Sequence, residues 1–383
     1  MTASALTRPG ERERLVVKFG QIDWTLTLLL CLIAAAGGMM LYSIAGGAWR
    51  PWAAPHLIRF GFCLLLMLGL AMVDLRVWFT VAYPLYGLGF LLLLAVEVVG
   101  HRSLGATRWL QFGPVGIQPS EVMKIGMVLA LARFYQGLPA PLARWSWRLL
   151  IPAAMILVPA VVVAKEPDLG TAILLTATGG AVMMLAGLDL RVIIAGFVSI
   201  LAAAPFAKLL LKPYQWDRVT IFLHPENDPT KAGYHILQAK IALGSGGVLG
   251  KGFGLGSQSQ LNFLPEKQTD FIFATLAEEF GLVGCLSILA LYLATIIIAI
   301  RIASVSHSHF GRLSAAGVTA TFGLYVLING AMVMGLAPVV GVPMPLLSYG
   351  GTVMLTVMIG FGLIQSVRVH RYSEVGRGSG SLL

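Results

Sequence analysis

The sequence has 383 residues, of which 57% are hydrophobic and only 11% are charged, and it carries a formal net charge of +10. A soluble domain carries about a quarter charged residues, so the composition excludes an ordinary soluble enzyme. The positive balance does not indicate nucleic-acid binding, because Lys and Arg stand mostly in loops between apolar runs. Basic residues in such loops orient membrane spans and meet anionic headgroups.

Ten apolar runs predict an all-α integral membrane protein with ten transmembrane helices. The expected spans are residues 22–44, 57–73, 77–97, 118–135, 147–164, 168–187, 190–210, 271–300, 313–336 and 352–367. Ten crossings place both termini on one face, and the excess of Arg and Lys in its short loops assigns that face to the cytoplasm. We expect a cytoplasmic tail over residues 1–20, a membrane domain over 21–370 and a second tail over 371–383.

The first polar cluster lies on the opposite, outer face, where the fourth span begins. Gln118 or Ser120 could cap this helix, and Pro119 suits its first turn. Glu121 and Lys124 stand three residues apart and therefore share one helix face. Ionisable groups in a span usually face a partner or an aqueous cavity. The pair is either a self-satisfied ion pair or part of a cavity for an anionic substrate, with Lys124 as a phosphate-binding charge.

Two further polar segments lie on the outer face. Arg108 precedes Trp109 shortly before the fourth span, either as an interfacial anchor or as a pyrophosphate contact. Asp168 opens the sixth span, either as its N-cap or as a cavity residue, and Thr171 follows on the same helix end. The residues alone leave both alternatives open at each position.

Residues 211–270 form the longest loop between predicted spans, on the outer face. Long loops in compact domains are usually functional or disordered, and this loop is not of low complexity. The apolar periodicity of residues 234–243 predicts an amphipathic helix in the membrane interface. A glycine-rich run follows over residues 244–256.

The end of the long loop brings a carboxylate to the start of the eighth span. Asp270 directly precedes the apolar run that begins at Phe271. A helix N-terminus favours the charged form of a carboxylate, whereas burial beside aromatic rings favours the neutral form. From the residues alone, an N-cap role is the default interpretation of Asp270. Glu278 and Glu279 lie further into the span, and we expect one of them to face the bundle interior.

Residues 337–351 are too apolar for an ordinary surface loop and too rich in Pro and Gly for a straight helix. Non-helical backbone at membrane depth is tolerated only against protein or a water-filled cavity. We therefore expect a re-entrant or cavity-lining segment on the outer face, before the tenth span. All the polar segments above share this face, which suits a cavity with cations for an anionic group and carboxylates for proton transfer.

Four motifs together resemble those of the shape, elongation, division and sporulation (SEDS) family. They are FLPEKQTDFIF at 263–273 with AEEFG at 277–281, QPSE at 118–121, PDLGT at 167–171 and PMPLLSYGG at 343–351. The resemblance covers residues 20–370, which is nearly the whole chain. The short N-terminal tail and the segment 263–273 are more similar to elongation members than to division members. One departure is Thr352, where the family often has Ser.

The resemblance implies ten helices, with a long periplasmic loop between the seventh and eighth, in the inner membrane of a bacterial cell. It also implies a peptidoglycan glycosyltransferase that polymerises lipid II, a disaccharide-pentapeptide on undecaprenyl pyrophosphate, during cell elongation and maintenance of rod shape. The family's essential aspartate corresponds to Asp270, which would be the general base of an inverting transfer. The candidate substrate-binding residues are Arg108, Gln118, Glu121, Lys124, Asp168, Gln238 and Ser348.

Further implications concern partners and alternatives. The resemblance implies a class B penicillin-binding protein and other elongation-complex proteins as partners. A divalent cation, Mg²⁺ or Mn²⁺, is open as an aid to catalysis, although the sequence shows no dedicated metal cage. The alternative functions are a lipid II flippase, a division member of the same family and a scaffold without chemistry. A flippase needs polar residues through the full depth of the bundle, whereas those found here cluster at the outer face.

Overall fold

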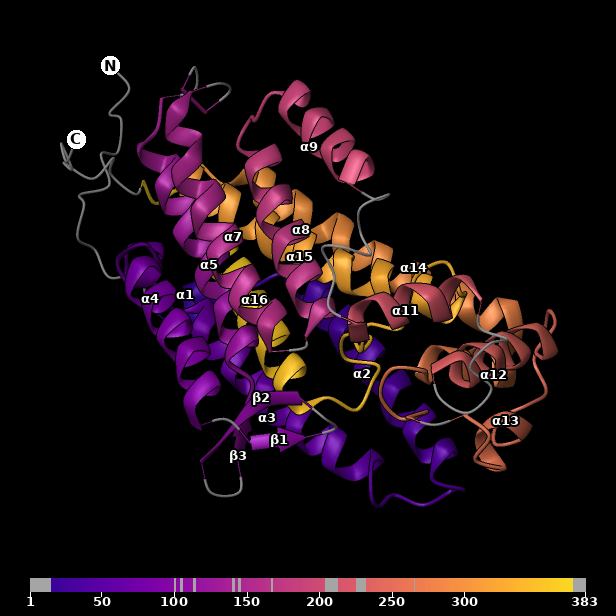
Figure 1. Cartoon of the computed structure of the whole chain (residues 1–383). Coiled ribbons are helices and arrows are strands. Elements are labelled where there is room, and N and C mark those ends of the chain that lie inside the picture. The colour runs from indigo at the N-terminus through magenta and orange to yellow at the C-terminus, as the bar shows by residue number, and fades with distance from the viewer. Residues whose placement is uncertain are drawn as a thin grey trace.

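The computed structural model describes residues 15–99, 101–103, 106–112, 115–139, 142–143, 146–166, 168–203, 213–224, 232–264 and 266–374. Long helices pack side by side in one bundle (Figure 1). They are α2 (Trp24–Ile44), α3 (Ala53–Ala71), α4 (Leu75–Val99), α5 (Pro119–Gly137), α7 (Leu150–Lys165), α8 (Leu169–Leu185), α14 (Ile272–Val305), α15 (His309–Val333) and α16 (Gly351–Val369). The tenth long helix, α9 (Leu190–Ala203), lies apart from these nine in Figure 1. The shorter helices are α1 (Leu15–Gly20), the 3-10 turn η1 (Trp147–Leu149), α11 (Pro213–Leu223), α12 (Ala232–Ser245) and α13 (Ser257–Gln260).

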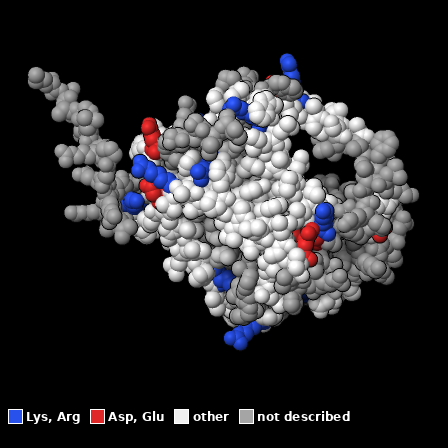
Figure 2. Space-filling model, turned by 60° about the vertical axis from the view of Figure 1, so that its left-hand side comes forward, with Lys and Arg blue, Asp and Glu red and all other residues white. Residues whose placement is uncertain are grey.

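Each predicted span overlaps one of the ten long helices. Within the described residues, seven helices are long and apolar enough to cross a membrane, and α8 is a shorter apolar helix of 17 residues. Helix α5 is not one of these seven, because it carries three charged residues, Glu121, Lys124 and Arg133. Figure 2 shows a broad surface without charged side chains, which lie mainly toward its margins. The protein is therefore a multi-pass membrane protein.

The predicted tails and the long loop are described only in part. Residues 1–14, the end of the seventh predicted span at 204–210 and residues 375–383 lie outside the described residues. In the long loop, the helix predicted over 234–243 is confirmed as α12, which packs against α14. Helices α11 and α13 in the same loop were not predicted.

A small antiparallel sheet precedes α5 and was also not predicted. Its strands β1 (His101–Ser103), β2 (Ala106–Phe112) and β3 (Val115–Ile117) are ordered β1-β2-β3. The Trp109 ring packs on Gly116, where an added Cβ would lie 3.2 Å from it. The β2 strand contacts both α4 and α5, so the sheet covers the end of the bundle where the fourth predicted span begins.

The glycine-rich run fills a break in α14. Gly281 has φ 64° and ψ −160° inside this helix, so helical hydrogen bonding is interrupted there. Leu282 N donates to Gly247 O at 3.0 Å, and Lys251 N donates to Glu278 O at 3.0 Å. The loop therefore satisfies backbone groups that the break would leave without partners inside the helix.

Residues 334–350, between α15 and α16, are non-helical and packed against other helices. The Tyr292 hydroxyl of α14 donates to Pro345 O at 2.5 Å. A Cβ added to Gly170 of α8 would collide with the carbonyl oxygen of Val340, so only glycine permits this approach. The irregular segment expected before the last helix is confirmed, and it packs against α8 and α14.

Gly250→Ala is expected to destabilise the protein more than Gly254→Ala. Both glycines have left-handed backbone, with φ of +80° and +74°, so either alanine costs about 1–2 kcal/mol of backbone strain. A Cβ at Gly250 would also collide with the Glu279 carbonyl oxygen, whereas Gly254 has no atom within 4 Å of an added Cβ. Thermal unfolding in detergent should give the lower midpoint for Gly250→Ala. Equal midpoints would contradict the close packing of this loop on α14.

Candidate functional site

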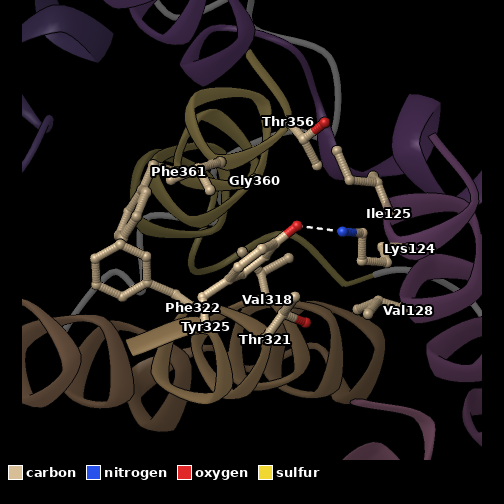
Figure 3. Close-up of a pocket in the computed structure, with 11 residues that line it drawn as sticks. Lys124, Ile125, Val128, Val318, Thr321, Phe322, Tyr325, Thr356, Gly360 and Phe361 are labelled. Carbon is tan, nitrogen blue, oxygen red and sulfur yellow. Dashed lines mark hydrogen bonds between the residues drawn. The ribbon is translucent and has the colours of Figure 1, made fainter. Parts of the chain in front are cut away.

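A buried ion pair at the start of α5 forms the centre of the site. Lys124 Nζ lies 2.5 Å from Glu121 Oε1, and these side chains are only 1% and 5% exposed. Lys124 also donates to the Tyr325 hydroxyl of α15, the contact drawn as a dashed line in Figure 3. That hydroxyl lies 3.0 and 2.9 Å from the two carboxylate oxygens of Glu121. Each buried charge is therefore compensated inside a closed group of three side chains.

The residue before α5 extends this polar group to α8. Gln118 is the N-cap residue of α5, with Pro119 in its first turn, but its side chain makes no capping bond. Instead, Gln118 Nε2 donates to Asp168 Oδ2 at 3.3 Å. Asp168 Oδ1 accepts a hydrogen bond from Thr171 N at 3.3 Å as the N-cap of α8. Asp168 thus caps its helix and also belongs to the polar network around the ion pair.

Asp270 is attached to the same face of α15. The N-cap position of α14 belongs to Phe271, so Asp270 is not the helix cap. Asn329 Nδ2 of α15 donates to Asp270 O at 2.9 Å. Asn329 follows Tyr325 by four residues, so the two side chains are neighbours on one helix face, about 5–6 Å apart. Helix α15 therefore holds the Asp270 turn one helical turn from the contact with the ion pair.

The side chain of Asp270 faces the irregular segment 334–350. Its Oδ2 would lie 3.6 Å from a Cβ added to Gly341. Asn329 Nδ2 also donates to Val342 O at 2.8 Å, so one amide joins the turn and the segment. The start of the turn is held by Lys267, whose Nζ donates to Asn262 Oδ1 at 2.8 Å. Burial lowers the pKa of this lysine from its ordinary value.

A cavity of about 880 Å³ lies beside the ion pair, between α3, α4, α5 and α16. Its polar lining includes Arg59, Gln118, Glu121 and Thr352. Its apolar lining is formed mainly by Ile58, Phe62, Leu85, Val122, Ile125, Leu355 and Ile359. The Arg59 guanidinium lies 5.0 Å from the centre of the Tyr349 ring, just before α16. The cavity thus combines a cation and polar groups near the helix starts with a long apolar wall.

Among the remaining predicted residues, Ser348 and Lys124 do not line this cavity. Ser348 is buried, and its Oγ accepts a hydrogen bond from Met344 N at 2.9 Å inside the irregular segment. Lys124 stands behind Glu121 and does not line the cavity of 880 Å³. The backbone of Arg108 belongs to β2, whereas its side chain lies outside the described residues.

Gln238 stands near the Asp270 turn instead. It is half-buried on α12, three residues after His235. The His235 ring stacks on Phe271, with ring centres 6.1 Å apart. Because residues three apart share a helix face, Gln238 lies on the side of α12 that approaches the start of α14.

Both carboxylates of the AEEFG motif are buried, where one was expected. Glu278 and Glu279 are 0% and 1% exposed. Glu278 Oε1 lies 2.7 Å from Lys251 Nζ of the glycine-rich run. Glu279 Oε1 accepts a hydrogen bond from Ser43 Oγ of α2 at 2.5 Å. These contacts hold the loop and α2 to the first part of α14.

Sequence reasoning missed three residues of the site. Asn329 had a usable signal, because an amide inside an apolar span usually has a partner there. Arg59 was not singled out, because a single basic residue near a span end is ordinary in a membrane protein. Tyr325 carried no signal, since a tyrosine in an apolar run is ordinary and its partners stand about two hundred positions earlier in the chain.

Residues 23–373 match the FtsW/RodA/SpoVE family, described as cell cycle proteins. The chain is 42% identical over 351 residues to the peptidoglycan glycosyltransferase MrdB of Escherichia coli strain K12, covering 91% of this chain and 94% of that protein. It is similar, with a TM-score of 0.79 and 32% identity, to a chain from a peptidoglycan synthase complex that coordinates polymerisation and crosslinking, covering 92% and 99%. Rod shape determining protein RodA of Thermus thermophilus matches with a TM-score of 0.70 and 30% identity, covering 92% and 98%.

Lys124→Met is expected to destabilise the protein by about 3–5 kcal/mol, because it leaves the Glu121 carboxylate buried without its cation. The double variant Glu121→Gln/Lys124→Met removes both charges and should regain much of that loss. Thermal unfolding in detergent compares the two variants with the wild type. A double variant no more stable than Lys124→Met would show that an uncompensated charge is not the main cost.

Proposed function

This chain belongs to the FtsW/RodA/SpoVE family of cell cycle proteins and is a peptidoglycan glycosyltransferase, and we propose that it polymerises lipid II into glycan strands during cell elongation. The observation that carries this proposal is the placement of Asp270. Asn329 holds its turn to α15 one helical turn from the Tyr325 contact with the Glu121–Lys124 pair. The facing segment leads directly into Gly351, which lines the cavity.

In the proposed reaction, Asp270 is the general base. Its carboxylate takes the proton from the 4-hydroxyl of the acceptor GlcNAc as that oxygen attacks the anomeric carbon of the donor MurNAc. The bond from that carbon to the pyrophosphate oxygen breaks, and undecaprenyl pyrophosphate leaves with the bonding electrons. One direct displacement inverts the anomeric centre. A positioned general base typically contributes about 10²–10⁴-fold in rate.

The leaving group needs stabilisation of its negative charge rather than a proton. Lys124 is 1% exposed and already bound by Glu121 and Tyr325. We therefore propose that Lys124 compensates the charge of Glu121 and holds its side chain in place, rather than contacting the pyrophosphate directly. Arg59 lines the cavity and makes no ion pair within the described residues. We propose that Arg59 binds the pyrophosphate, with Arg108 as a second candidate. The apolar wall suits the polyprenyl chain.

A divalent cation is not well matched by the side chains in the described part of the chain. No three His, Cys, Asp or Glu residues come together there in a way that could hold a metal ion. Magnesium is often bound through one or two carboxylates together with substrate phosphates. Mg²⁺ or Mn²⁺ would therefore rely chiefly on the pyrophosphate of the substrate.

The distribution of polar groups favours a polymerase over a flippase. Gln118 and Glu121 line the cavity at the start of α5, whereas Ile125, Leu355 and Ile359 form much of the wall further along the helices. A flippase would need polar contacts along the full path of the headgroup. The synthase complex that contains a structural relative supports a class B penicillin-binding protein and other elongation proteins as partners.

We also propose the inner membrane as the location, with both termini in the cytoplasm. Lys18 Nζ lies 3.0 Å from His370 Nε2, which supports a shared face for the two ends of the membrane domain. The loop charges on that face support its cytoplasmic assignment.

Asp270→Asn is expected to lower lipid II polymerisation by about 10²–10⁴-fold, because the amide has the same shape but cannot accept the proton. The measurement is polymerisation of labelled lipid II by purified protein, with and without its penicillin-binding protein. Glu266→Gln is the matched control, since it makes the same charge change at an exposed position of the same turn. Near wild-type activity of Asp270→Asn would refute the general-base assignment.

Arg59→Gln is expected to raise KM for lipid II by about 10- to 150-fold, because a charge-assisted contact to the pyrophosphate is worth about 1.5–3 kcal/mol. Arg59→Lys should restore part of this loss. Arg50→Gln removes an exposed charge from the loop before α3 and should leave KM near the wild-type value. Equal KM values for Arg59→Gln and Arg50→Gln would exclude Arg59 from substrate binding.

A further inference from the structure

A second cavity lies at the opposite end of the bundle, where α2 begins and α14 and α16 end. Its volume is about 290 Å³. Its lining residues are Asp23, Thr25, Ile298, Arg301, Ile302, Val305 and Arg368. Asp23 N donates to Gln365 Oε1 at 3.0 Å, which joins the start of α2 to α16 beside this cavity. The proposed glycosyl transfer uses none of these residues.

The side chains that line this cavity carry more positive than negative charge. Arg301 and Arg368 come from two different helices, and neither forms an ion pair within the described ranges. Asp23 is the one carboxylate in the lining, and its Oδ1 accepts a hydrogen bond from Leu26 N at 3.0 Å as the N-cap of α2. Two positive charges therefore face one negative charge that already has a structural partner. An anion in the cavity would balance the excess.

The cavity also has an apolar wall on α14. Ile298, Ile302 and Val305 recur at intervals of four and three residues, so they share one helix face. Exposed aromatic rings lie at the same end of α2, where Trp24 packs edge-on against Phe19 with ring centres 5.0 Å apart. Aromatic rings in such positions are typical of the membrane–water interface. The ligand of this cavity should therefore combine an anionic head with an apolar chain.

A simpler account treats the two arginines as independent helix-end residues. Arg368 lies in the last turn of α16, where a cation is favoured by the helix dipole, and long basic side chains often extend to the interface. That account explains each arginine separately. It does not explain why both line one cavity together with Thr25 and an apolar stripe.

We propose that this cavity binds the phosphate headgroup of an anionic phospholipid, with Arg301 and Arg368 on the phosphate and an acyl chain along α14. Basic pockets between transmembrane helices are known to take such headgroups. The bound lipid would bridge α2, α14 and α16 at the face that carries both ends of the membrane domain.

The test is lipid titration of the purified full-length protein in neutral detergent, followed by native mass spectrometry. The wild type should bind phosphatidylglycerol more tightly than phosphatidylcholine. Arg301→Gln/Arg368→Gln should weaken phosphatidylglycerol binding on the order of 30-fold, since each basic residue contributes about 1 kcal/mol. Phosphatidylcholine binding should not change. Arg301→Lys/Arg368→Lys should keep most of the preference.

The matched control is Arg76→Gln/Arg312→Gln, which makes the same charge change at exposed positions where α4 and α15 begin on the same face. This control should bind phosphatidylglycerol like the wild type. Equal weakening in control and cavity variants would mean that only overall charge matters and would overturn the proposal. Displacement of the lipid by glycerol phosphate would point to a soluble phosphate ligand and would also overturn it. Thr25→Val should weaken phosphatidylglycerol binding a few-fold without removing a charge. This variant tests the proposal even if the double arginine variant fails to fold.

Discussion

Two opposite charges can remain inside a bundle of apolar helices only when each compensates the other, and the Glu121–Lys124 pair meets this condition with the help of Tyr325. The pair joins α5 to α15. Gln118, one turn earlier, continues the polar contacts to Asp168 and α8. Asn329, one turn later on α15, holds the turn that carries the candidate base. The buried group therefore lies on the same two helices that make the contacts to Asp168 and to the Asp270 turn.

The second constraint acts on the long loop. Its glycine-rich run is hydrogen-bonded to α14 around Gly281, and its charged residue Lys251 is paired with buried Glu278. Lys267 fixes the following turn through Ser259 and Asn262. The half of the loop nearest Asp270 is thus built into the helix bundle. The proposed base, Asp270, would thereby keep one orientation toward a substrate, which general-base catalysis requires.

The sequence predicted the features that depend on local patterns. Apolar runs located the ten long helices, Pro119 marked the start of α5, and the 234–243 periodicity located α12. Motif resemblance, rather than periodicity, singled out Asp270. The sequence could not reveal contacts between residues far apart, such as Tyr325 with Glu121 or Ser43 with Glu279, 236 positions apart. The strands β1–β3 were missed because three to seven residues are too few for a reliable alternation pattern.

The break in α14 has a consequence for depth in the bilayer. The helix has 34 residues, and the part after the break, Leu282–Val305, is about 36 Å long at 1.5 Å per residue. That part alone exceeds the hydrocarbon thickness of about 30 Å. The part before the break, residues 272–280, need not enter the hydrocarbon core of the bilayer. In the proposed reaction, the sugar headgroup of lipid II would therefore reach Asp270 while hydrated, and only its lipid tail would enter the hydrocarbon.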